Sequence, residues 1–197
     1  MDVSAVVPGV ALDLRYATAD NFVGEALYDA AVCLLRPDVA AMVARAQRYL
    51  EARRAGYALV LKDCYRPLAA QRRMWELVRA TPKRRYVANP DSPTGSVHCR
   101  GAAVDVTVRG ADGRELDMGT PYDFLGPLAE VRLEEEMVRA GKLTRTQVEN
   151  RRLLRAAMRE GGGFLATARE WWHFDALRGQ ALWARYPPLD RPLGARP

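Results

Sequence analysis

The sequence contains only two histidines among 197 residues, His98 and His173. Lysine is nearly as rare, because arginine supplies all of the basic side chains except Lys62, Lys83 and Lys142. No apolar run approaches the roughly 20 residues that a membrane-spanning helix needs, so we expect no membrane span. Since histidine is so scarce, the surroundings of the two that are present are informative.

Cysteine is also scarce, and its three residues, Cys33, Cys64 and Cys99, cannot all pair with one another. None belongs to a C-x-x-C motif, so we expect reduced thiols rather than a disulfide framework. Cys99 directly follows His98, and a role as metal ligand or regulatory thiol is therefore an alternative. The first residues lack the basic and apolar segments of a signal peptide, which predicts a cytoplasmic location.

The net charge of +6 raises the question of a nucleic-acid partner. The arginines are spread along the chain, however, and the basic cluster at 151–155 lies beside Glu149 and Glu160 in a helical pattern, as on a solvated helix face. The sequence has no zinc-finger spacing, no RNA-binding motif and no basic region followed by heptads. We therefore expect no nucleic-acid partner.

The length and the 49% of apolar residues fit one globular domain over residues 1–197. Apolar residues recur at helical spacing after Pro37, which suits a first helical turn, and Gly56 ends that pattern. Thr144 and Gln147 have the spacing of a capping box that opens another helix. Together these patterns predict an α+β fold. The predicted helices cover 37–55, 68–80 and 144–160, the predicted strands cover 57–61, 102–108 and 170–174, and proline-rich stretches form a loop at 81–95 and a surface tail at 187–197.

Both histidines lie in short motifs with a spaced acidic residue. His98 precedes Asp105 by seven residues, with Gly101 between them where the backbone can turn, and Glu170 precedes His173 by three. Two neutral imidazoles and one carboxylate are a common ligand set of catalytic zinc, which keeps another position for water. We therefore predict one zinc ion bound by His98, Asp105 and His173. Glu170 is then available as the base that accepts a proton from water.

The same residues also have a purely structural interpretation. His98 can be a buried histidine that hydrogen-bonds in the core, Asp105 can stabilise a turn, and Glu170 can pair with one of the many arginines. The aromatic residues of the segment 171–174 are interpreted as packing residues that lower the local dielectric constant. Residues 170 and 173 would share a face on a helix, whereas in a strand they need a local irregularity to do so.

Arg66 follows the predicted strand 57–61 and precedes Pro67, so we expect its backbone to be rigidly placed. A guanidinium at such a position can stabilise the oxyanion of a tetrahedral intermediate. The alternative is an ordinary salt bridge to Asp63, and the two roles are compatible. With a bound zinc ion and Glu170, these residues indicate a hydrolase.

Several sequence blocks, spread over most of the chain, match one group of zinc enzymes. The blocks are 13–22 with Gly24, 65–67, 96–105, 117–120 with 122–124, and 170–174. Through them the chain resembles the VanX-type D-alanyl-D-alanine dipeptidases, which are related to bacterial D,D-carboxypeptidases and to the hedgehog signalling fold. The blocks 13–22 and 117–120 favour the dipeptidase branch over the wider group.

The resemblance implies an α+β domain with a small central antiparallel sheet flanked by helices. It also implies zinc-dependent hydrolysis of D-alanyl-D-alanine, with Glu170 as general base and Arg66 polarising the scissile carbonyl. The small dipeptide is then the partner of the site. The substrate-binding residues implied by the same analogy are Tyr16 and Asp123 for the ammonium group, and Ser96 and Asp63 near the other end.

Two positions depart from the family's usual pattern: Val23 stands where threonine is usual, and Cys99 where serine is usual. Neither removes a catalytic group, although Cys99 could make the site sensitive to oxidation or to soft metals. A cell-wall D,D-carboxypeptidase or L,D-peptidase that acts on longer peptides is the main alternative. A zinc-stabilised binding domain is another, but it leaves Glu170 and Arg66 without a use. Dipeptidase activity would serve either resistance to glycopeptide antibiotics or recycling of D-alanine.

Overall fold

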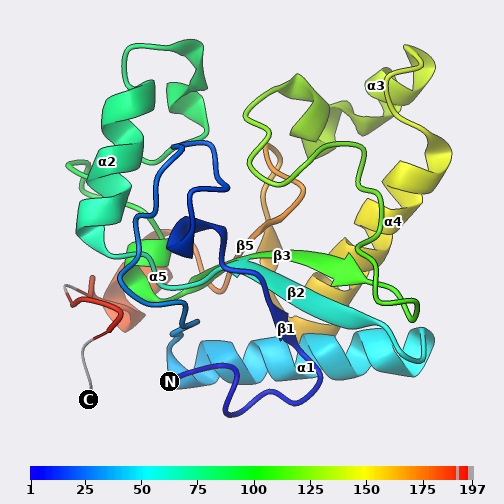
Figure 1. The fold of residues 1–197 in the computed structure, drawn as a ribbon, viewed down its shortest axis with the longest axis horizontal. Helices are drawn as coiled ribbons and strands as arrows, with labels where there is room; N and C mark the ends of the chain where they lie inside the picture. Colours follow the sequence, from blue (N-terminus) through cyan, green and yellow to red (C-terminus); the bar gives the residue numbers. More distant parts are fainter. Residues whose placement is uncertain (190, 195–197) are drawn as a thin grey trace.

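The computed structural model describes residues 1–189 and 191–194. Within these residues, one five-stranded sheet lies at the centre of the molecule, with its strands in the order β1-β2-β3-β5-β4 (Figure 1). β1 is parallel to β2, and the other neighbouring pairs are antiparallel. The predicted α+β class is confirmed, and the parallel edge strand is an addition to the expected sheet. The strands span Ala11–Leu12 (β1), Ala58–Asp63 (β2), Ala103–Arg109 (β3), Leu165–Ala166 (β4) and His173–Asp175 (β5).

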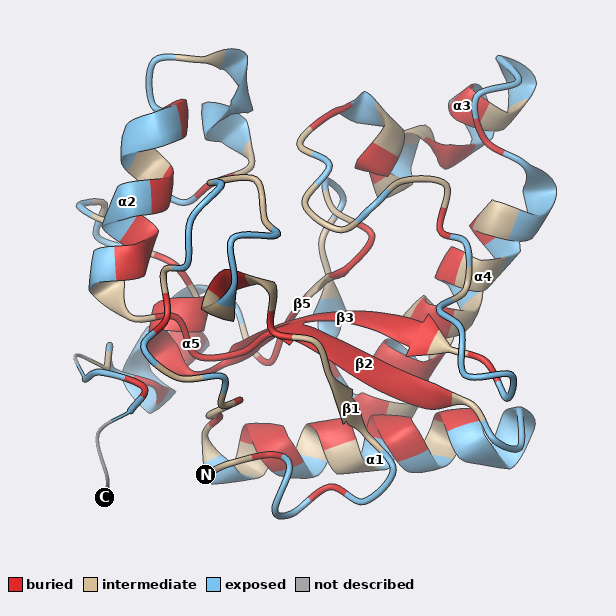
Figure 2. Cartoon of the chain, in the orientation of Figure 1, coloured by how far each residue is buried: buried red, intermediate tan, exposed pale blue. Residues whose placement is uncertain are grey.

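The longest helix, α1, runs along one face of the sheet (Figure 1). Pro37 opens it, and Val39, Val43 and Leu50 recur at helical spacing on its buried face, while its outer face is exposed (Figure 2). The helices are α1 (Pro37–Arg53), α2 (Leu68–Val78), α3 (Glu134–Arg139), α4 (Arg145–Ala156) and α5 (Gly179–Arg185), and shorter helical turns cover Arg15–Ala17, Pro82–Arg85, His98–Arg100, Pro127–Ala129, Val131–Leu133 and Ala157–Gly162.

β2 and β3 form the buried middle of the sheet. Lys62 is the unusual residue of β2, because its ammonium is buried with the strand. It lies 2.5 Å from a carboxylate oxygen of Asp13 and of Glu115, in keeping with the rule that buried charges are paired. The register of β2 against β3 shifts between Leu61 and Asp63. Such bulges change the direction of side chains near the end of a strand.

The long helices lie close to their predicted ranges. α1 ends at Arg53, two residues before the predicted end, and α2 likewise ends two residues early, at Val78. Thr144 accepts a hydrogen bond from the backbone of Gln147, whose side chain accepts one from the backbone of Thr144, so the capping box is confirmed. The helix after Thr144 continues as a π-helical turn and stops at Gly163, whose φ is 83°.

The predicted strand at 170–174 is wrong at its start. β5 begins only at His173, because residues 171–172 form a turn. The elements β1, β4, α3 and α5 were not predicted. Each spans seven residues or fewer, which is too short for a periodic pattern to stand out.

The expectation of three reduced thiols is also wrong. Cys33 and Cys64 form a disulfide with their Cα atoms 5.3 Å apart. Cys33 lies before α1 and Cys64 directly follows β2, so the fold brings together two cysteines that are 31 positions apart in the sequence. Cysteine number alone carried no information about this proximity. Cys99 is buried and unpaired with another cysteine.

The C-terminal tail runs over the surface as predicted, as far as the structure describes it. The backbone nitrogen of Leu189 donates to the carbonyl oxygen of Cys99, and Leu193 is buried. Residues 190 and 195–197 of the predicted tail lie outside the described residues. In the described part of the chain, every helix is too short or too polar to cross a membrane.

Candidate metal and substrate site

Two of the predicted ligands face each other on neighbouring strands. Asp105 of β3 is paired in register with His173 of β5. Directly opposed residues of an antiparallel pair lie on the same face of the sheet, with Cβ atoms about 5 Å apart. His173 Nδ1 lies 3.0 Å from Asp105 Oδ1. The sheet therefore brings together two side chains that are 68 positions apart in the sequence.

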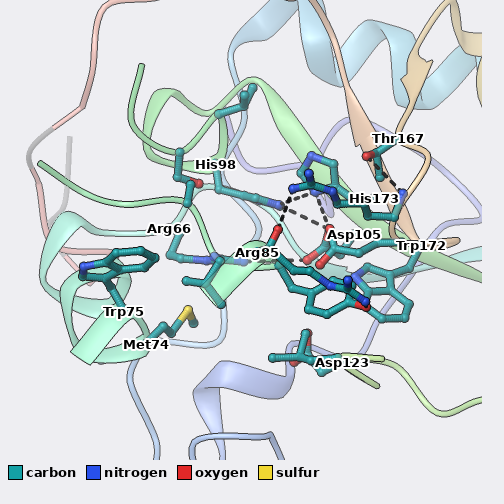
Figure 3. Close-up of a pocket in the computed structure, with 18 of the residues that line it drawn as sticks. Arg66, Met74, Trp75, Arg85, His98, Asp105, Asp123, Thr167, Trp172 and His173 are labelled. Carbon is teal, nitrogen blue, oxygen red and sulfur yellow. Dashed lines mark hydrogen bonds and ion pairs between the residues drawn. The ribbon is translucent and has the colours of Figure 1, made fainter. Parts of the chain in front are cut away.

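His98 reaches the same point from the short helical turn before β3. That turn ends at Gly101, whose φ of 64° lies in the left-handed region that favours glycine, so the chain reverses there as predicted. His98 Nε2 lies 3.3 Å from Asp105 Oδ1 and 3.1 Å from His173 Nδ1. Figure 3 shows the three side chains pointing toward one another.

The three facing atoms form a nearly equilateral triangle with edges of 3.0, 3.1 and 3.3 Å. Ligands of a tetrahedral zinc ion with bonds of about 2.0–2.1 Å stand about 3.3–3.4 Å apart. The geometry and the mixed nitrogen and oxygen donors therefore fit a divalent metal, and the group can hold one. Among the described residues Cys99 is not part of this group, and burial raises the pKa of its thiol.

Each histidine has a partner on the far side of its ring. His98 Nδ1 lies 2.7 Å from the carbonyl oxygen of Cys64, which leaves Nε2 for a metal. His173 Nε2 lies 2.8 Å from Asp175 Oδ1, which leaves Nδ1. Partners of this kind fix the tautomer and the orientation of a ligand. Both rings are therefore held ready for a metal.

Sequence reasoning missed two residues of the site, Asp175 and Tyr122. The carboxylate of Asp175 also accepts a hydrogen bond from Arg178 Nε at 2.8 Å, and Tyr122 OH donates to Asp105 Oδ2 at 2.9 Å. Asp175 follows His173 by two residues on one strand and so lies on the same face, a signal that the sequence contained. Tyr122 had no comparable signal, because a loop positions it.

Glu170 lies half-buried in the loop before β5. It lines the same cavity as His98, Asp105 and His173, the three candidate metal ligands that we call the metal cluster. The turn at residues 171–172 separates it from His173 and supplies the irregularity that the spacing required. Burial raises the pKa of Glu170 to about 7, with His173 opposing the shift and Asp105 adding to it. A carboxylate with a pKa near neutrality is suited to accepting and returning a proton.

Arg66 is held firmly beside the cluster. Its Nε and Nη2 donate to Asp63 Oδ2 at 2.9 and 2.6 Å, and its Nη1 donates to Gln71 Oε1 at 2.8 Å. The salt bridge between Arg66 and Asp63, which the sequence offered as an alternative role for Arg66, is therefore present. A guanidinium carries more N–H donors than these contacts use. Nη2 also lies 3.7 Å from Asp105 Oδ2, so Arg66 remains close to the reacting region.

Asp63 does not line the site, contrary to the expectation. Its side chain is fully buried, and its Oδ1 accepts hydrogen bonds from Tyr28 OH at 2.6 Å and from the backbone of Cys64 at 2.8 Å. Its other oxygen is taken by Arg66. Four donors therefore fill the acceptor positions of the Asp63 carboxylate. Asp63 holds Arg66 in place and does not face the cavity.

A cavity of about 520 Å³ opens beside the metal cluster. Figure 3 shows Met74 and Trp75 of α2 on one side of it, with Thr167 and Trp172 on the other. The predicted residues that line the cavity are Tyr16, Arg66, Ser96, His98, Asp105, Asp123, Glu170 and His173.

Tyr16 and Asp123 form a pair on the cavity wall. Tyr16 OH donates to Asp123 Oδ2 at 2.7 Å. Asp123 has a φ of 62°, in the left-handed region that non-glycine residues adopt infrequently and that clusters at functional sites. Burial and the nearby charge of Asp105 raise the pKa of Asp123 well above its ordinary value. A carboxylate in this environment gains from a cationic partner.

The aromatic residues after Glu170 pack in the core, as expected. Trp171 and Phe174 are buried, and Trp171 Nε1 donates to Thr120 Oγ1 at 2.8 Å. Trp172 is equally buried but borders the cavity.

A family model described as D-ala-D-ala dipeptidase, of peptidase family M15, matches residues 1–191. The chain belongs to this family. It is 37% identical over 189 residues to a D-alanyl-D-alanine dipeptidase of Escherichia coli strain K12, covering 96% of this chain and 88% of that dipeptidase. It is 32% identical over 186 residues to a D-alanyl-D-alanine dipeptidase of Enterococcus faecium, covering 86% of this chain and 87% of that dipeptidase.

Membership of the D-ala-D-ala dipeptidase family makes the chain a hydrolase of the metallopeptidase class. The group of possible metal ligands agrees with this assignment, since a metallopeptidase requires such a group near its substrate cavity. The resemblance inferred from the sequence blocks is thus confirmed.

Proposed function

We propose that this chain is a zinc-dependent dipeptidase that hydrolyses D-alanyl-D-alanine. His98, Asp105 and His173 hold one zinc ion per chain. The triangle of donor atoms with edges of 3.0–3.3 Å is the main support, together with the family of the chain. When bound, zinc supplies a Lewis acid that polarises a carbonyl group and lowers the pKa of water.

Glu170 acts as the general base. Its carboxylate accepts a proton from the attacking water, and the resulting carboxylic acid gives that proton to the leaving amine as the peptide bond breaks. A pKa raised to about 7 by burial suits both halves of this cycle, because the group can take up and release a proton near neutral pH.

Arg66 stabilises the negative charge that develops on the scissile carbonyl oxygen. Asp63 and Gln71 already hold the guanidinium, so its unused N–H donors need little reorganisation during the reaction. The Arg66 guanidinium also lies 5.2 Å from the centre of the Tyr16 ring, which restricts it further. Asp63 and Gln71 are thus positioning residues for Arg66.

The two ends of a free dipeptide meet groups of opposite charge. Asp123, which accepts a hydrogen bond from Tyr16, binds the ammonium group. Burial raises the pKa of Asp123, and a cation beside it favours the charged form of its carboxylate. Ser96 lies near the other end, where arginines around the cavity attract the substrate carboxylate. The preference for D-residues is proposed from the family alone.

A peptidase that removes D-alanine from longer peptides is the second candidate. The cavity of about 520 Å³ lies in the range that holds drug-sized ligands, which are larger than a dialanine. This volume favours a substrate with additional atoms beyond the two alanines.

The test compares free D-Ala-D-Ala with an N-acylated tripeptide that ends in D-Ala-D-Ala. The dipeptidase should cut only the former, because acylation removes the ammonium that Asp123 binds. Metal analysis should give one zinc per chain. Glu170→Gln should keep its zinc and lose about 10²–10⁴-fold in turnover, whereas the exposed control Glu149→Gln should behave as wild type.

Cleavage of the tripeptide without cleavage of the dipeptide would favour the second candidate. Near-normal turnover by zinc-loaded Glu170→Gln would remove Glu170 from the mechanism.

A further inference from the structure

Four exposed arginines line the cavity among the described residues, and one of them, Arg178, is paired with Asp175. The other three lie at the mouth of the cavity. Arg84 and Arg85 belong to the turn at Pro82–Arg85, and Arg169 directly precedes Glu170. All three are exposed and line the cavity, and we call them the arginine mouth. The acidic residues that line the same cavity belong to the metal cluster and its surroundings. They are Asp105, Asp123, Glu170 and Asp175.

The protein neutralises little of the charge at the arginine mouth. Arg85 Nη2 lies 2.8 Å from Glu130 Oε1, and Glu130 is shared with Arg132. Arg169 Nη1 donates to the carbonyl oxygen of Arg85 at 2.8 Å, which fixes its position without cancelling its charge. Within the described residues, no carboxylate lies within ion-pair distance of Arg84 or Arg169.

A dialanine leaves part of this charge unused. In the proposed function its ammonium meets Asp123, its scissile carbonyl meets Arg66, and a single carboxylate forms a bidentate pair with one guanidinium only. The methyl side chains offer no further anionic group. The volume of about 520 Å³ provides room for a longer side chain.

We propose that the arginine mouth selects dipeptides that carry an acidic side chain. This inference rests on the proposed function and adds to it a preference, among the other D,D-dipeptides that the site accepts, for those with a carboxylate beyond the backbone. That carboxylate pairs with Arg84 or Arg169 while the backbone groups keep their contacts near the metal cluster. The expected preference is about fivefold in kcat/KM, the upper end of what an exposed ion pair contributes.

Two matched pairs of substrates test the proposal: D-Ala-D-Glu against D-Ala-D-Gln, and D-Glu-D-Ala against D-Gln-D-Ala. The side chains within a pair are similar in size and differ in charge. kcat/KM is measured for the full, metal-loaded chain, with D-Ala-D-Ala as the reference. We expect the acid to exceed its amide by about fivefold in at least one pair, and the excess to shrink as salt is added.

Arginine variants connect the preference to the mouth. Arg84→Gln and Arg169→Gln should each lower the acid-to-amide ratio, and Arg84→Glu should bring it below one. The control is Arg139→Gln on the exposed side of α3, which should leave the ratio unchanged. Because each ratio compares two substrates of one protein sample, partial misfolding or partial metal loading does not alter it.

A ratio of one or less in both pairs overturns the proposal. So does a ratio that Arg84→Gln and Arg169→Gln leave at the wild-type value. Failure of the wild-type chain to hydrolyse D-Ala-D-Ala would instead contradict the proposed function, and this inference with it. The two kinds of failure are therefore distinguishable.

Discussion

The two histidines of the cluster present different ring nitrogens to the same point. The backbone carbonyl of Cys64 occupies Nδ1 of His98, whereas the carboxylate of Asp175 occupies Nε2 of His173. A carboxylate partner also raises the basicity of the imidazole, which a carbonyl does less strongly. Asp175 should therefore matter for metal affinity although it does not touch the metal position.

We predict that Asp175→Asn weakens zinc binding by about 10–100-fold. The amide keeps nearly the same shape but removes the negative charge that supports His173. The measurement is competition for zinc against a chromophoric chelator. Asp112→Asn in the exposed loop after β3 is the matched control. Wild-type affinity in Asp175→Asn would mean that strand geometry alone orients His173.

The pKa of Glu170 predicts the acid limb of the pH profile. Burial raises this pKa to about 7, and a divalent cation at the cluster favours the carboxylate and lowers it again. Below the resulting pKa the group is protonated and cannot accept a proton from water. kcat/KM should therefore fall on the acid side, with a midpoint between the ordinary glutamate value of about 4.3 and about 7. If the residual activity of Glu170→Gln fell at low pH with the same midpoint as the wild type, the titrating group would be a residue other than Glu170.

The sequence was sufficient to predict which side chains meet in the cluster, but not which residues hold those side chains in place. The meeting of His98, Asp105 and His173 at one point could be predicted, because histidine is rare and each histidine lies near a spaced acidic residue. The placement of Asp63 could not be predicted, because a bulge in β2 and the donors around it decide which groups reach the cavity.

Helix α4 holds the loop that carries the Tyr122 and Asp123 side chains. Arg151 of α4 is fully buried, and it donates from Nε to the Met118 carbonyl oxygen at 2.7 Å and from Nη2 to that of Leu128 at 3.1 Å. Both ends of the loop are therefore fastened by one guanidinium. Burial lowers the pKa of Arg151 to about 10, which leaves it charged at neutral pH.

We predict that Arg151→Lys lowers the free energy of unfolding by about 2–3 kcal/mol and raises KM. An ammonium lacks the planar fork that serves two carbonyl groups, so one of them loses its partner. Urea denaturation measures the stability, and steady-state kinetics measure KM. The neighbouring Arg152→Lys, on the exposed face of α4, is the control. Equal stability of the two variants would show that the loop does not depend on Arg151.

Long periodic elements could be predicted from the sequence, and short ones could not. α1 and α2 repeat apolar residues over several turns, and α4 opens with a capping box and is followed by glycines, which fixes the type and the approximate ends of all three. β5 is only three residues long, and its aromatic neighbourhood suggested an earlier start than the turn at 171–172 allows. The strand that positions His173 is thus set by its pairing with β3 rather than by local preference.

The Cys33–Cys64 disulfide ties the segment before α1 to the end of β2. The carbonyl of Cys64 orients His98, and Arg66 follows two residues later, so the bridge lies directly behind the site. Disulfides persist mainly in oxidising compartments. The cytoplasmic location stays a prediction, and the disulfide is the feature that argues against it.

Thiol counting and stability test the bridge together. Denatured protein prepared without reductant should show one reactive thiol, that of Cys99, and reduction should raise the number to three. The double variant Cys33→Ser/Cys64→Ser should lose about 2–4 kcal/mol of unfolding free energy, because its unfolded chain is no longer cross-linked. Cys99→Ser, which leaves the bridge intact, is the control. Three thiols before reduction would return the cysteines to the reduced state that the sequence indicated, and the cytoplasmic prediction would then stand unopposed.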